Sequence, residues 1–274
     1  MVKRISISVY CLFLMVLPAF TGCQLKYHLN KQDALALAPD VNQITVSNNN
    51  IARAIKAAGG YKAWIDTKKM ELDYIVTFYK PARAPTAETI QYAWGPDYYL
   101  TQQHYEIYPW SNSIRVSDTE PQDRFVWQLS QGNLEVLEGA KRFNSLPAAA
   151  QDRYFAEAIL YLITAPARLV DSSARITDEI RPVKLEGLWY YPIERPSDNI
   201  DRYWSKVIFY QNTESALVDI LWFAGVDSDK YFAVRGYDYR RISKNGVLIP
   251  AKIELFTTDA GNIIRQRLVK IDLK

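Results

Sequence analysis

Residues 69–79 read KMELDYIVTFY, and this stretch decides the fold class. Apolar side chains at Leu72, Tyr74, Val76 and Phe78 alternate with the polar residues Glu71, Asp73 and Thr77. Successive side chains of a β-strand point to opposite faces of the sheet, so a period of two predicts a strand with one buried face.

Similar runs recur on both sides of this stretch and predict a sheet of many strands. Short turns such as Gln131-Gly132-Asn133, Asn245-Gly246 and Gly261-Asn262 separate several of them. Consecutive strands joined by tight turns form an antiparallel meander. The further strands are expected at residues 87–94, 98–108, 113–118, 123–130, 133–138, 186–193, 204–211, 215–224, 230–241, 247–257 and 262–272.

Two segments have the helical period instead. Residues 51–58 follow a suitable N-cap in Asn50 and precede Gly59-Gly60, a suitable stop. Residues 147–164 begin with a proline at a first helical position, carry one apolar stripe and end before Pro166. The sequence therefore predicts a single α+β domain over residues 51–274, with a large antiparallel sheet and two helices packed on one face.

The N-terminus predicts export. Lys3 and Arg4 precede an apolar run over residues 5–20, and the small residues Thr21-Gly22 stand directly before Cys23. This pattern is typical of a secretory signal and too short for a membrane span. Segment 20–23 also resembles the lipobox of bacterial lipoproteins, which implies a signal peptide at 1–22, cleavage after Gly22 and lipid on Cys23. The alternative is an ordinary signal peptide with an incidental cysteine.

Residues 23–50 are polar and predict a flexible, lipid-anchored tether. Cys11 lies within the predicted signal, so the mature chain keeps only Cys23 and forms no internal disulfide. The net charge of +3 falls to about +1 because Lys3 and Arg4 leave with the signal. A near-neutral chain argues against a nucleic-acid partner.

The sequence contains little recognisable catalytic chemistry. It has two histidines, His28 and His104, and no metal-ligand spacing, nucleophile elbow, Walker motif or dinucleotide fingerprint. Asp227-x-Asp229 resembles a fragment of a calcium loop but lacks the remaining ligands, which favours a solvated turn. We therefore predict no catalytic residue, metal or cofactor, although a pair of carboxylates cannot be located from spacing alone.

The order of these elements resembles a group of secreted bacterial proteins with a LolA/LolB-like fold, whose members carry no assigned function. The resemblance rests on Ala57-Ala58-Gly59-Gly60, Trp64, Arg153-Tyr154-Phe155, Tyr161-Leu162 and the hairpin at 245–250. It implies a curved antiparallel sheet, an incomplete barrel, with helices on its concave face. In the lipoprotein carriers LolA and LolB, the space between sheet and helices accepts acyl chains.

A ligand would meet apolar side chains from both layers. On the strand, Val218, Ile220 and Trp222 are expected to share one apolar face; on the helix, Phe155 and Ile159 are expected to meet it. The same pattern also fits an ordinary packed core.

The leading hypothesis is an envelope lipoprotein, held to a membrane through Cys23, that binds a lipid or a lipidated protein. Gln24 after the anchor cysteine resembles enterobacterial sorting to the outer membrane. One alternative is a glycan- or peptide-binding module that uses Tyr98, Tyr99, Tyr108 and Trp110. Another is a structural role in an envelope complex with an unidentified protein.

Overall fold

The computed structural model describes residues 49–79, 98–118, 124–146, 153–170, 181–196, 204–226, 230–242 and 246–274. Segment 1–22, Cys23, nearly all of the tether, the strand expected at 87–94 and Asp227-x-Asp229 lie outside the described residues. The predicted signal, anchor and domain boundaries therefore stay predictions.

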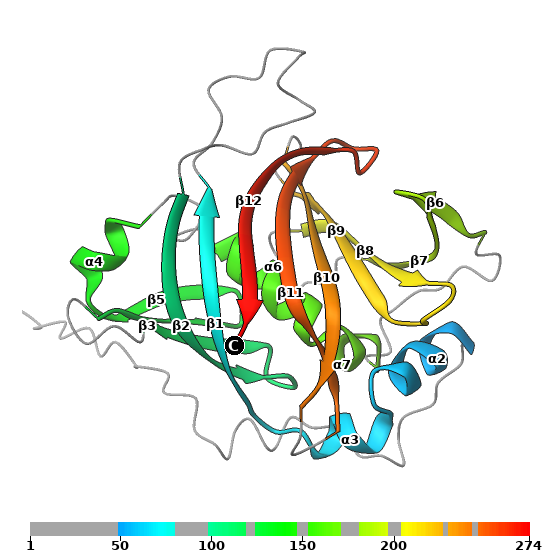
Figure 1. Ribbon diagram of the computed structural model, residues 1–274, viewed down its shortest axis with the longest axis horizontal. Helices are drawn as coiled ribbons and strands as arrows, with labels where there is room; N and C mark the ends of the chain where they lie inside the picture. The colour runs from blue at the N-terminus through cyan, green and yellow to red at the C-terminus, as the bar shows by residue number, and fades with distance from the viewer. Residues whose placement is uncertain are drawn as a thin grey trace, which may run out of the picture.

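The described strands form one antiparallel sheet of twelve strands, in the order β5-β4-β3-β2-β1-β12-β11-β10-β9-β8-β7-β6 (Figure 1). Their bounds are β1 Met70–Tyr79, β2 Tyr98–Tyr108, β3 Ser113–Asp118, β4 Val126–Ser130, β5 Asn133–Glu138, β6 Val183–Leu185, β7 Leu188–Pro196, β8 Trp204–Asn212, β9 Val218–Gly225, β10 Tyr231–Arg241, β11 Leu248–Thr258 and β12 Ile264–Leu273.

Strand β1, formed by residues 70–79, joins the two halves of this sheet. Strand β1 pairs with β2 on one side and with β12 on the other, with Tyr74 opposite Leu273. Its alternation is confirmed, because Leu72, Tyr74, Val76 and Phe78 are all buried. The polar positions between them face outward or are half-buried.

The described helices are α2 Asn49–Ala57, α3 Tyr61–Asp66, α4 Ala140–Asn144, α6 Arg153–Ile163 and α7 Ala165–Val170. Helix α2 ends at the predicted glycines: Gly59 and Gly60 have φ angles of 116° and 91°, which side chains with a Cβ rarely adopt. Among these described helices, none has the length and hydropathy needed to cross a membrane.

Helix α6 lies inside the curve of the sheet. It contacts β9, β10 and β11 on one side and β3 and β4 on the other, so one helix touches strands near both ends of the sheet. Figure 1 shows α6 behind β1, β12, β11 and β10. Every residue of α6 from Phe155 to Ile163 is buried. The predicted α+β class and the strongly curved, unclosed sheet with a helix on its concave face are confirmed.

The strand expected near 186–193 is confirmed as β7, which begins at Leu188. Glu186 and Gly187 adopt positive φ angles of 49° and 90° and turn the chain between β6 and β7. Such a pair is typical of a tight hairpin. Helix α6 ends before Pro166, as predicted. Pro166 itself lies in the first turn of a further helix, α7, where a proline is well tolerated.

Candidate apolar site at the split between two strands

Three of the five predicted ligand residues lie in the core between helix and sheet, and of the five only Val218 lines the pocket described below. Phe155, Ile159 and Val218 belong to one buried apolar cluster. Phe155 packs edge-on against Phe78 of β1, with 5.5 Å between the ring centres. That these side chains bind an apolar ligand stays a prediction.

The other two lie on the opposite face of the sheet. Ile220 and Trp222 pack with Tyr190, Tyr210 and other residues in a second cluster, whereas their neighbours Leu221 and Phe223 join the core around α6. The prediction that Val218, Ile220 and Trp222 share one face is therefore wrong.

A β-bulge is the physical reason. On the partner strand β8, Tyr210 pairs with Ile220 but the next residue, Gln211, pairs with Val218. Asp219 is thus an extra residue without its own partner on β8, and the side-chain alternation is interrupted there.

Strands β9 and β10 separate beyond this bulge. Their pairing ends at Arg235 opposite Ile220, and β10 continues along β11 alone. Asp238 has a φ angle of 51° and interrupts the pairing of β10 with β11 between Tyr237 and Tyr239. The sheet is therefore split between the start of β9 and the second half of β10.

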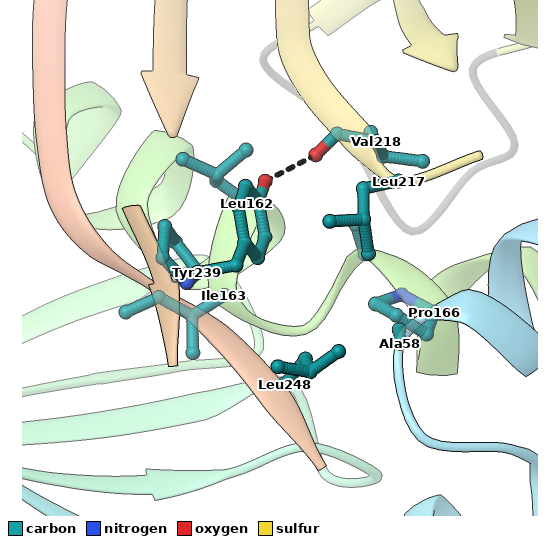
Figure 2. A pocket seen from close by; sticks show the side chains of 10 residues that line it. Ala58, Leu162, Ile163, Pro166, Leu217, Val218, Tyr239 and Leu248 are labelled. Atoms are coloured by element: carbon teal, nitrogen blue, oxygen red, sulfur yellow. Dashed lines mark hydrogen bonds between the residues drawn. The ribbon is translucent and has the colours of Figure 1, made fainter. Parts of the chain in front are cut away.

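Tyr239 bridges this split. Its hydroxyl donates a hydrogen bond of 2.6 Å to the carbonyl oxygen of Val218, drawn as the dashed line in Figure 2. The ring passes over Gly236, where a Cβ atom would lie 2.8 Å from the Tyr239 hydroxyl and 2.9 Å from Pro250. Only glycine fits at position 236 without displacing these neighbours.

A small apolar pocket lies beneath the bridge. Figure 2 shows side chains from α6, the segment before β9, β10 and β11 pointing toward one another around it. The residues that line it are Ala58, Leu162, Ile163, Ala165, Pro166, Leu217, Val218, Tyr239, Leu248 and Pro250. Its cavity volume is about 10 Å³, which is room for about one water molecule. An acyl chain can enter only if side chains move.

Polar groups surround the same split. Asp219 accepts a hydrogen bond of 3.0 Å from the side-chain amide of Asn212. Burial raises the pKa of Asp219 to about 6, and the bond from Asn212 opposes part of that rise. Burial of the Tyr239 hydroxyl likewise holds its pKa well above the ordinary value, with the Asp219 charge adding to the effect. Tyr239 is therefore a neutral hydrogen-bond donor.

The sequence did not single out Leu217, Gly236 or Tyr239. A glycine inside a strand pattern is a known sign of close approach between backbone and side chain, so Gly236 carried a usable signal. The sequence gives no such signal for the bulge at Asp219 or for the split, because aspartate has no conformational preference that marks an unpaired position in a strand.

The aromatic residues proposed for sugar stacking are differently placed. Tyr108 is buried, and its hydroxyl lies 3.3 Å from Glu106. Trp110 is half-buried, and its indole N–H donates to the carbonyl oxygen of Trp64 at 3.2 Å. The side chains of Tyr98 and Tyr99 lie outside the described residues. Tyr108 and Trp110 therefore form no open stacking platform.

His104 lies far from the split, on β2. Its Nδ1 atom is 2.8 Å from the Asp73 carboxylate of β1, and both side chains are partly exposed. Within the part of the chain that the structure describes, histidine, cysteine and carboxylate side chains form no group of three able to hold a metal ion.

No protein-family model matches the chain, and neither does any curated protein. Among solved structures, the LolA superfamily protein NE2245 from Nitrosomonas europaea is 14% identical with a TM-score of 0.48, over 84% of this chain and 92% of that one. A DUF1329 family protein from Desulfovibrio piger is 8% identical with a TM-score of 0.45, over 82% and 90%.

A putative outer membrane lipoprotein-sorting protein domain from Vibrio parahaemolyticus is 9% identical with a TM-score of 0.43, over 89% of this chain and 92% of that one. At these identities and scores the likenesses say nothing about ligand or partner. The chain is similar to these solved proteins, one of which is described as a LolA superfamily protein.

Proposed function

We propose that this chain is a lipid-anchored protein of the bacterial envelope that is delivered to the outer membrane. We further propose that it binds one apolar chain of a lipid or lipidated protein. The observation that carries the proposal is the apolar pocket at the split between β9 and β10, where the core around α6 comes close to the surface. Burying methylene groups against such a lining is favourable and needs no polar recognition.

The pocket holds about one water molecule in the described state, so the ligand must displace side chains to enter. Leu217 is the most suitable one to move, because it is half-buried and precedes β9 rather than lying inside the ladder. Tyr239 holds the split closed through one neutral hydrogen bond, whose net contribution is about 1 kcal/mol. Opening the site therefore breaks no backbone pairing.

Binding is tested with a fluorescent polyene fatty acid added to the purified full chain. A Leu217→Trp substitution fills the pocket and is expected to abolish the fluorescence increase. Leu268→Trp is the matched control, because Leu268 is also a half-buried leucine at the edge of the same core but lies on β12, away from the pocket. Equal binding by both variants and the unmodified chain would contradict the proposed site.

The anchor is tested separately. Cys23→Ser removes the thiol on which the proposed lipid attachment depends. We expect the unmodified chain in the membrane fraction of its host, with a mass increased by acyl groups, and the variant without that added mass. An unmodified chain without acyl mass would contradict the anchor while leaving the binding experiment valid.

A further inference from the structure

The β6–β7 hairpin lies at one end of the sheet, and its outer strand β6 pairs only with β7 among the described strands. Glu186 and Gly187 form its two-residue turn. Around this turn Lys184 is opposite Trp189 and Leu185 is opposite Leu188.

Large apolar side chains are exposed on this hairpin. Val183 is 37% exposed, Leu188 46% and Trp189 51%, and they make up three of the seven large hydrophobic residues that are exposed in the described part of the chain. Leu188 and Trp189 are neighbours on one strand and therefore point to opposite faces. Leu188 and Trp189 are thus exposed on opposite faces of the hairpin, whereas Leu185 before the turn packs against the second cluster.

The charges of the hairpin favour an anionic surface. Arg181 and Lys184 are exposed, and the Lys184 ammonium lies 5.9 Å from the centre of the Trp189 ring. The carboxylate of Glu186 forms an ion pair with Arg235, whose side chain is only 4% exposed on β10. The charge of Glu186 is thus neutralised by Arg235, whereas the cationic side chains of Arg181 and Lys184 are exposed.

We propose that this hairpin is a contact site for the surface of a bilayer that contains anionic lipids, with Trp189 and Leu188 in the head-group region. Tryptophan is enriched at membrane interfaces, and exposed lysine and arginine are attracted to anionic lipids. Protein interfaces are depleted in lysine at their centre, which disfavours a protein partner for the Lys184–Trp189 pair. The contact does not require lipid on Cys23.

The test places one environment-sensitive fluorophore on the hairpin. The full chain is purified with Leu188→Cys or, as the matched control, Ile263→Cys; Ile263 is an apolar residue, 60% exposed, in the turn before β12. Both variants also carry Cys23→Ser, so no lipid on Cys23 can bind the vesicles and a difference between the variants reports position. The probe surfaces are vesicles of phosphatidylcholine with or without phosphatidylglycerol.

We expect a blue shift at position 188 with the anionic vesicles and none at position 263. In the same assay Lys184→Gln should weaken vesicle binding about fivefold, whereas Lys141→Gln, an exposed lysine on α4, should leave it unchanged. No shift at 188, an equal shift at both positions, or a shift only on adding other proteins would overturn the proposal. Because Cys23 is replaced in these variants and no fatty acid is added, the result is independent of the anchor and of fatty-acid binding.

Discussion

Replacing Asp219 with asparagine removes a charge whose burial opposes folding. The pKa of Asp219 is about 6 in the folded chain, against an ordinary value of 3.8. Above pH 6 the carboxylate is ionised in both the folded and the unfolded chain, and the folded chain bears the cost of burying it. The rise in pKa from 3.8 to about 6 corresponds to about 3 kcal/mol of unfolding free energy.

The sign follows from proton binding. Between pH 6 and 4 the folded chain takes up a proton before the unfolded chain does, so falling pH stabilises the fold through this group, and rising pH removes that stability. Asparagine keeps an oxygen that can accept the bond from Asn212. We therefore expect Asp219→Asn to raise the unfolding free energy by about 3 kcal/mol at pH 8 and by nearly nothing at pH 4.

Urea denaturation of the unmodified chain and of Asp219→Asn, from pH 4 to pH 8, measures the difference in unfolding free energy. The contributions of all other titrating groups cancel in this difference. Asp66→Asn is the control, because Asp66 is an exposed carboxylate paired with Lys62 and should change stability by less than about 1 kcal/mol. A difference for Asp219→Asn that is the same at pH 4 and pH 8, or a variant less stable at pH 8, would refute the reasoning.

Three further substitutions test the packing. Tyr239→Phe removes the hydrogen bond to Val218 and should cost about 1 kcal/mol in urea denaturation while increasing fatty-acid binding; unchanged binding would show that the bond does not restrain the split. Gly59→Ala places a Cβ atom 2.7 Å from the carbonyl oxygen of Gly246 at a φ of 116°, so the melting temperature should fall, and an unchanged value would contradict this geometry. Phe155→Ala should cost about 3–5 kcal/mol, since the ring is buried against Phe78; a cost under about 1 kcal/mol would mean that the core is loosely packed.

The fold class was predictable because the apolar alternation of β1 is long and uninterrupted. Other local features were not. The strand expected near 186–193 begins at Leu188, because Glu186 and Gly187 form a turn that their composition did not indicate. Strand propensity allows glycine at this position but does not require a hairpin. The hairpin is held by the pairing of β7 with β8 and by the ion pair between Glu186 and Arg235.

The candidate site was predictable only in part. Phe155 and Ile159 lie on the helix that the apolar period predicts. Because every residue of α6 from Phe155 to Ile163 is buried, their burial does not depend on which face of the helix they occupy. Ile220 and Trp222 were misplaced because a single bulged residue, Asp219, reverses the faces on either side of it. A packed core and a lipid pocket share one sequence pattern, so the sequence could not predict the size of the small pocket beside Tyr239.

The pairing of β1 with β12 has a consequence for how the chain reaches this structure. Tyr74 and Leu273 are opposite one another at the middle of the sheet, although nearly the whole domain lies between them along the chain. The two halves of the sheet are joined only there, so the central seam cannot close until the last strand has been synthesised. Pairing over such a distance is slow to form. The two halves of the sheet are therefore joined only after the whole domain has been synthesised, although the hairpins within each half can pair earlier.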